Sequence, residues 1–344
     1  MKKKVLFISL LIILIVTLIF MIGVNSIAEE QKEVKSTTTI YLAGCRVGDP
    51  GYIFSQALAY FINKKSDWLR VDVVATAGAT ANVEMVIKNP TEYFALAPLS
   101  AYGYMPKEEQ YGNYDKLKFI ANGTSNTFTF VTYDPTIKSF ADLSNKTVNI
   151  SRKGAELTHY IEKMIQESGA KNVKLVYGGT GESVTNLKDG LVDVAYTKID
   201  RVYPATWLKS AEIIDMETRK PLYYVNIQPQ VADRLIEQEG SVEMPCRVYP
   251  GAIDLRQQAE VWALASPLIF AADERMDEKI VYEITRIIFE TPSTTWAVWH
   301  SQGAHMNEDF IPVYFGDPSS IHPGALKYYN EHGVKLVDIR DIVR

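Results

Sequence analysis

Three basic side chains in this sequence are placed where they could bind a carboxylate. Arg46, Lys198 and Arg201 each follow a predicted strand, in segments expected to be loops. A guanidinium binds a carboxylate through two parallel hydrogen bonds, and an ammonium supplies a compact charge. These residues predict a site for a small organic acid, with Arg46 first among them because its loop opens the first helix. The alternative is that each is an ordinary solvated or salt-bridged residue.

Five further residues in the predicted loops and helix starts could complete such a site. Tyr52 and Tyr249 each offer a ring face and a hydroxyl, and Asn82 offers an amide. Thr180 lies in a loop that contains three glycines. Glu156 would repel an anion or bind a cationic group. Pockets use only a few placed polar groups, and these are the expected ligand-binding residues.

The residues that could support catalysis do not form a known motif. The sequence has no Gly-x-Ser-x-Gly elbow, no phosphate-binding Gly-x-x-x-x-Gly-Lys loop and no His-Glu-x-x-His. His300 and His305 are poorly spaced for one helix face, and His322 belongs to a Pro-Gly turn. Cys45 has no base near it in sequence. We therefore expect no catalytic residue, no metal and no cofactor, and keep a secreted enzyme as an alternative.

Residues 38–62 have the pattern of a strand, a loop and a helix. The strand is rich in β-branched and apolar residues, the loop in glycine and proline, and the helix has apolar residues at helical spacing. The first N–H groups of such a helix are unpaired and favour an anion in the loop. This segment alone is also compatible with an ordinary connection.

The same order of elements occurs twice along the chain. Each copy is predicted as strand, loop, helix, strand, loop, short helix and strand, although the two copies share no simple sequence identity. This alternation predicts an α/β fold of two similar lobes with mostly parallel sheets and ligands at the carboxyl ends of the strands. After the segment 38–62, the predicted elements are 71–76, 81–88 and 93–97 in the first copy, and 147–150, 156–167, 173–176, 182–188 and 193–197 in the second.

Two apolar segments outside the repeat, 127–133 and 260–272, are predicted to be strands that carry the chain between the lobes. Helices expected at 274–289, 294–302 and 323–333 would return to cover the first lobe. The predicted domains are therefore lobe I at 37–130 plus 264–344 and lobe II at 131–263. The cleft between lobes joined by two crossing strands would bind the ligand, and closure would follow a hinge motion.

The N-terminus has the pattern of an export signal. Lysines at positions 2–4 precede an apolar run over 5–24, and small residues at 26–28 fit a cleavage site. The run is long enough to span a bilayer, so residues 1–28 are expected to be a signal peptide or an uncleaved membrane anchor. Residues 29–36 are a polar linker. We expect an extracytoplasmic protein whose only membrane contact is this segment.

Charge and cysteine content exclude several classes of protein. Without the three N-terminal lysines, 33 basic residues face 41 acidic ones, a net charge near −8. This charge argues against nucleic acid as a partner. Only Cys45 and Cys246 are present, too few for a disulfide scaffold or a zinc ribbon. They could pair, although two separate buried thiols are favoured.

Several short motifs, in order, resemble the TAXI-type solute receptors of tripartite (TRAP) transporters. The resemblance extends from residue 38 to about 334, most of the exported chain. The matching residues are Ile321-His322-Pro323-Gly324-Ala325, Tyr328-Tyr329, Glu331, Gly333, Gly78, Asn82, Ala141-Asp142-Leu143, Val148, Leu187-Lys188-Asp189-Gly190 and Asp193.

This resemblance implies a two-lobed periplasmic-binding-protein fold of type II that captures a small organic acid or amino acid and delivers it to a TRAP-type membrane permease. A ligand-sensing module for a membrane signalling partner would have the same fold. The pocket loops depart from the family pattern at 48–52, 79, 97–99, 154–157 and 198–201. The resemblance therefore implies the scaffold and leaves the identity of the solute open.

Overall fold

The first repeat begins with the strand, loop and helix that the sequence predicts. In this computed structural model the described residues are 36–98, 114–153, 156–202, 206–239, 244–314 and 317–338. Pro50 starts the first helix of the described residues, at a position where a backbone N–H would have no hydrogen-bond partner within the helix. Phe54, Leu58 and Ile62 are on its buried face. The elements are β1 (Thr38–Ala43), α2 (Pro50–Lys65), β2 (Leu69–Val74), α3 (Ala79–Lys88) and β3 (Tyr93–Pro98).

The second repeat has the same order, and its first strand pairs in parallel with both others. Its last strand was predicted to end at residue 197 but continues to Val202, because it pairs with strands on both sides. Lys198 and Arg201 therefore lie within this strand and not in a loop. The elements are β5 (Thr147–Ile150), α5 (Glu156–Glu167), β6 (Lys174–Tyr177), α6 (Thr180–Lys188) and β7 (Val194–Val202).

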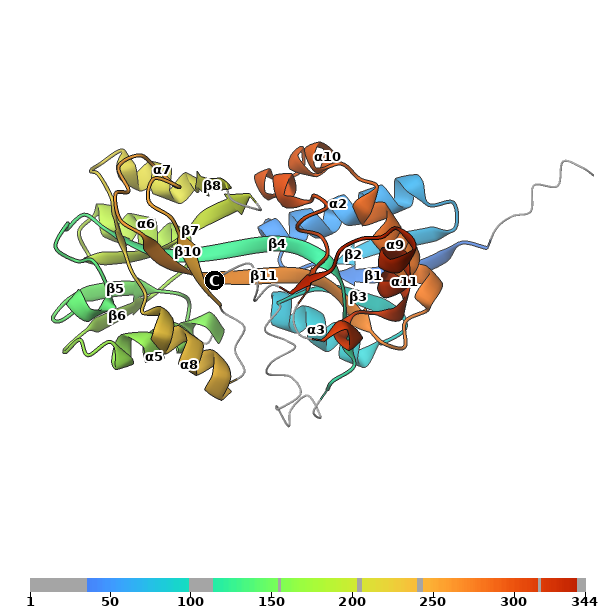
Figure 1. Ribbon diagram of the computed structural model, residues 1–344, viewed down its shortest axis with the longest axis horizontal. Coiled ribbons are helices and arrows are strands. Elements are labelled where there is room, and N and C mark those ends of the chain that lie inside the picture. Colours follow the sequence, from blue (N-terminus) through green and yellow to red (C-terminus); the bar gives the residue numbers. More distant parts are fainter. Residues whose placement is uncertain are drawn as a thin grey trace, which may run out of the picture. The chain divides into compact units, whose positions relative to one another are not determined.

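Two long strands, β4 (Leu117–Thr132) and β11 (Val261–Asp273), connect the repeats (Figure 1). They run antiparallel and are paired from Leu264 with Phe128 to Asp273 with Leu117. The sheet order is β2-β1-β3-β11-β4-β7-β5-β6. The α/β fold with two repeats and two crossing strands is as predicted. The strand pairing differs from the prediction. β1 pairs in parallel with β3, and β5 with β6 and β7, whereas the crossing strands pair antiparallel with each other and with β3 and β7. One mixed sheet therefore runs through both repeats.

The C-terminal helices lie close to their predicted positions, with one exception. The helix expected over 294–302 is shorter and is followed by a separate turn of 3₁₀ helix, in which Gly303 meets the backbone of Trp296 so closely that a Cβ there would lie 2.2 Å from the Trp296 carbonyl carbon. These elements are α9 (Glu278–Phe289), α10 (Ser293–Ala297), η4 (Ser301–His305) and α11 (Pro323–Glu331).

Several short elements had no sequence prediction, mostly between β7 and β11. They are η3 (Phe140–Asp142), β8 (Thr206–Lys209), α7 (Ala211–Glu217), β9 (Tyr223–Val225), α8 (Pro229–Glu239), β10 (Met244–Val248), β12 (Val313–Tyr314), η5 (Pro318–Ser320) and β13 (Val337–Asp338).

A hydrophobic cluster of buried residues from Phe130 to Leu264 packs α5 and α8 against the strands of the second repeat. A larger cluster includes the core of the first repeat and also residues of α6, β7, β8 and α7. Cys45 and Cys246 are both buried and form no disulfide, as expected. The predicted export segment, 1–28, and most of the linker lie outside the described residues. In the part of the chain that is described, no helix has the length and apolar content needed to cross a membrane.

Candidate functional site

One buried amide joins the carboxyl ends of three strands in the first repeat. The Oδ1 atom of Asn82 accepts hydrogen bonds from the Cys45 backbone N–H, at 3.2 Å, and from the Thr76 hydroxyl. Its Nδ2 atom donates to the Leu96 carbonyl at 2.7 Å. The side chain is 0% exposed. Asn82 therefore positions the loops after β1 and β2, a different role from the predicted ligand contact.

The Cys45 thiol lies beside this amide and is not suited to nucleophilic chemistry. Burial raises its pKa to about 11, although the hydrogen bond with Asn82 opposes this shift. The thiolate is the reactive form of cysteine, and at neutral pH this thiol remains protonated. The residue also has a left-handed backbone conformation, with φ of 68°. Cys45 is thus a buried structural residue at the turn that leads into Arg46.

Arg46 is exposed and is fixed at only one of its nitrogen atoms. Its Nε donates to the Ala77 carbonyl at 2.6 Å, which connects the loops after β1 and β2. No carboxylate of the described residues forms an ion pair with it. The terminal guanidinium nitrogens are therefore available to a ligand. Nearby in the sequence, Tyr52 is half-buried at the start of α2, and its hydroxyl accepts from Gln56 at 2.8 Å.

The second repeat carries an arginine in the corresponding loop, which the sequence analysis did not single out. Arg152 follows β5, is exposed and has no ion pair with any described residue. Its guanidinium lies over Gly179, where an added Cβ would be 3.0 Å from the nearest guanidinium nitrogen. Gly179 is the residue that caps α6. The signal that identified Arg46, an arginine in the loop after a strand, would also have identified Arg152.

Glu212, which the sequence analysis did not single out, interacts with two predicted site residues, Thr180 and Lys198. The Thr180 hydroxyl donates to the Glu212 carboxylate at 3.1 Å. Burial tends to raise the pKa of Glu212, but hydrogen bonding and the charge of Lys198 outweigh burial and lower it. Glu212 is therefore ionised beside Lys198 at neutral pH. The negative charge of Glu212 near Lys198 weakens the attraction of Lys198 for an anionic ligand.

Tyr249 lies apart from these residues. The strand before it, β10, ends with Val248 paired to Val261, whereas Lys198 of β7 is level with Leu264 of β11 through Phe128 of β4. Three residues of extended strand, about 10 Å, separate the two levels, and β4 and β11 lie between β7 and β10 in the sheet. Tyr249 is exposed and its ring lies 4.8 Å from the Arg247 guanidinium. The described contacts therefore do not bring Tyr249 next to Lys198, and its role in ligand binding stays a prediction.

Two other predicted site residues are described only by their backbone. Glu156 begins α5 and Arg201 belongs to β7, and their side chains lie outside the described part of the structure. No group of three or more His, Cys, Asp or Glu side chains among the described residues could hold a metal ion.

The fold and its loops define an α/β protein of two repeats joined by two long strands, with an exposed arginine in the first loop of each repeat. The chain belongs to the NMT1-like family, whose model matches residues 42–333. No curated protein matches the sequence.

Three solved structures that resemble this chain are distant from it in sequence. A TctC solute binding protein from Polaromonas is 13% identical, with a TM-score of 0.49 over 78% of this chain and 86% of its own. The periplasmic binding protein BugD is 11% identical, with a TM-score of 0.45 over 87% and 98%. The aliphatic sulphonate binding protein SsuA from Escherichia coli is 11% identical, with a TM-score of 0.44 over 90% and 98%. At such values these similarities do not identify a ligand.

Proposed function

We propose that this protein is an extracytoplasmic receptor that captures a small organic solute bearing a carboxylate. The observation that carries the proposal is the exposed arginine in the first loop of each repeat, Arg46 after β1 and Arg152 after β5. Neither has an ion-pair partner among the described residues. Each guanidinium can therefore form paired, charge-assisted hydrogen bonds with an anionic group.

Capture would occur by closure of two lobes. We assign residues 37–130 and 264–344 to lobe I and 131–263 to lobe II, so that β4 and β11 both pass between the lobes. A solute that contacts Arg46 and Arg152 together lowers the free energy of the closed state relative to the open one. The ends of the crossing strands would then act as the hinge.

The partner in this proposal is the membrane permease of a TRAP-type transporter, which would receive the solute from the closed receptor. The resemblance of residues 321–333 to TAXI-type receptors supports this partner, as does the pattern of an export signal in residues 1–28. The same signal supports a location outside the cytoplasm, with the segment cleaved or kept as an anchor.

The test is calorimetric titration of the full chain with amino acids, keto acids, dicarboxylates, sulfonates and neutral sugars. We expect binding among the carboxylates and none among the sugars. Replacing Arg46 with Ala should weaken the binding by about 10- to 100-fold, because a hydrogen bond to a charged group contributes about 1.5–3 kcal/mol. Arg152→Ala should have a similar effect. Arg234→Ala is the matched control, since Arg234 is paired with Glu167 on the surface.

Two outcomes would contradict the proposal. The first is carboxylate binding that is unchanged in both arginine variants. The second is binding of neutral sugars with no binding of any anion. Chemical turnover of a bound compound would instead support the secreted-enzyme alternative.

A further inference from the structure

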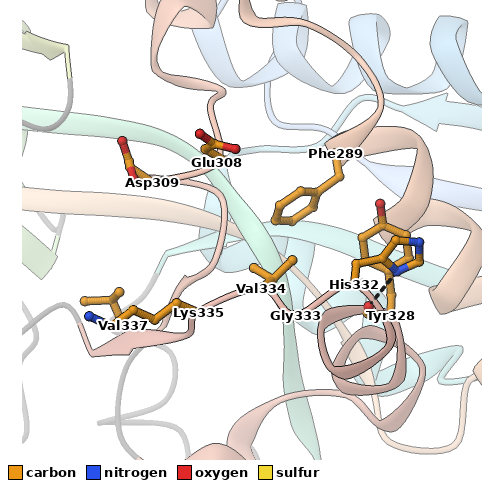
Figure 2. A pocket seen from close by; sticks show the side chains of 9 residues that line it. All are labelled: Phe289, Glu308, Asp309, Tyr328, His332, Gly333, Val334, Lys335 and Val337. Carbon is orange, nitrogen blue, oxygen red and sulfur yellow. Dashed lines mark hydrogen bonds between the residues drawn. The ribbon is translucent and has the colours of Figure 1, made fainter.

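A pocket in the C-terminal part of the chain is separate from the loops that carry Arg46 and Arg152. Its volume is about 620 Å³. Figure 2 shows the Phe289 ring between two acidic side chains, Glu308 and Asp309, and the pair of Tyr328 and His332. Neither Arg46 nor Arg152 lines it, so it is a separate site from that of the proposed solute. The lining residues are Phe289, Glu308, Asp309, Tyr328, His332, Gly333, Val334, Lys335 and Val337.

The acidic side of the pocket consists of two adjacent carboxylates. Glu308 and Asp309 are exposed, and neither forms an ion pair with any described residue. The side chain of Asn307 accepts hydrogen bonds from the backbone N–H groups of Asp309, at 3.1 Å, and Phe310, at 3.0 Å, which fixes this turn. Lys335 is the one basic side chain in the lining. The lining therefore favours a cationic guest.

The opposite side is aromatic. The rings of Phe289 and Tyr328 have centroids 5.5 Å apart, and the His332 ring stacks on Tyr328 at 4.1 Å with an interplanar angle of 22°. Tyr328 is buried, whereas Phe289 is half-buried and His332 is exposed. The faces of aromatic rings attract cations and also cover alkyl chains.

The orientation of the His332 ring determines which hydrogen bonds it can offer. Its Nδ1 lies 2.9 Å from the Tyr328 carbonyl oxygen (Figure 2). A carbonyl can only accept, so Nδ1 carries the proton and donates. In the neutral ring Nε2 is then an acceptor. The pocket thus combines carboxylate and imidazole acceptors with an aromatic surface, a set that suits a ligand rich in N–H donors.

We propose that this pocket binds an organic ammonium ion. The N–H groups of the ammonium donate to Glu308 and Asp309, and the alkyl body covers Phe289. In a ligand with two amines, the second amine reaches toward Nε2 of His332. Recognition rests on positive charge together with an apolar chain, so a neutral molecule of the same shape binds poorly.

Titration of the full chain with cadaverine, a linear diamine, tests this proposal. The comparison compound is the linear pentanediol of the same chain length, which lacks the charge. We expect calorimetric binding of the diamine only. The double variant Glu308→Gln with Asp309→Asn should weaken binding by about tenfold, which corresponds to about 1.4 kcal/mol. The matched control is Glu92→Gln, because Glu92 is an exposed carboxylate outside the pocket.

Phe289→Leu separates the aromatic contribution from the charge, since it retains an apolar residue but removes the ring. We expect a measurable loss of diamine affinity that is smaller than the loss in the Glu308→Gln, Asp309→Asn double variant. Raising the salt from roughly 0.05 M to roughly 0.5 M should also weaken binding, because exposed charges are screened.

Equal binding of the diamine and the diol would overturn the proposal, as would a double variant that binds cadaverine like the native chain. Absence of any cadaverine binding at millimolar concentration would also overturn it. These outcomes are independent of the receptor function, because Arg46→Ala and Arg152→Ala leave every lining residue of this pocket in place.

Discussion

The buried amide of Asn82 provides a test of how the first-repeat loops are positioned. Asn82→Ala removes the partners of the Cys45 N–H and the Leu96 carbonyl, both buried. A buried polar group left without a partner costs about 1–3 kcal/mol. With two such groups, and some relief by water, we expect a loss of about 3 kcal/mol in the free energy of unfolding. For a protein of this size that is roughly 4–6 °C in Tm.

The same variant should also reduce solute affinity at temperatures where the protein is fully folded. Asn82 connects the ends of β1, β2 and β3, and the Arg46 side chain is anchored to Ala77 in the loop after β2. When these loops lose their common hydrogen-bond partner, the arginine is no longer fixed in the orientation that binds an anion. We expect about a tenfold weaker affinity, measured by calorimetry well below the Tm of the variant.

Asn63→Ala is the matched control for stability. The amide of Asn63 bonds to both backbone groups of Val71, with distances of 2.9 and 2.7 Å, but it lies away from the loops. This variant should lose stability and retain affinity. The reasoning is refuted if the free energy of unfolding of Asn82→Ala lies within about 0.5 kcal/mol of that of the native chain. It is also refuted if Asn82→Ala and Asn63→Ala lose solute affinity equally.

Three further predictions follow from single sites. Gly179→Ala places a Cβ 3.0 Å from the Arg152 guanidinium, so the arginine must move; we expect weaker solute binding by calorimetry with an unchanged Tm. Burial lowers the pKa of His322 to about 4. In the unfolded chain His322 takes up a proton below about pH 6.5, whereas in the folded protein it does so only below about pH 4. The free energy of unfolding should therefore be unaffected by this residue above about pH 6.5 and should fall by up to roughly 3 kcal/mol as the pH decreases from about 6.5 to about 4. Denaturant titrations of His322→Asn, which retains a capping acceptor, should lack this slope. Gly303→Ala forces a Cβ to 2.2 Å from the Trp296 backbone, and we expect a Tm loss of several degrees or no folded protein; a native-like Tm would show that the segment adjusts freely.

The sequence alone determined the order of the elements in both repeats. Hydrophobic periodicity and turn residues are local properties, and they placed β5 and α5 at their observed bounds and most other repeat elements within a few residues. They also indicated the α/β class, the two crossing strands and the loop that carries Arg46. The strands between β7 and β11 have three to five residues each, too few to show a period, whereas α8 has 11 residues and its helical spacing could have been recognised.

Tertiary contacts decided the chemistry of the loops. Pairing with β4 and β8 extended β7, which put Lys198 in a strand beside Glu212. Strand pairing placed β11 and β4 between Lys198 of β7 and the strand that precedes Tyr249. Asn82 became a buried connector because two of its partners lie 14 and 37 positions away, and the third, Thr76, lies in the loop just before its helix. Such contacts depend on which strands meet, and local sequence carries little information about that.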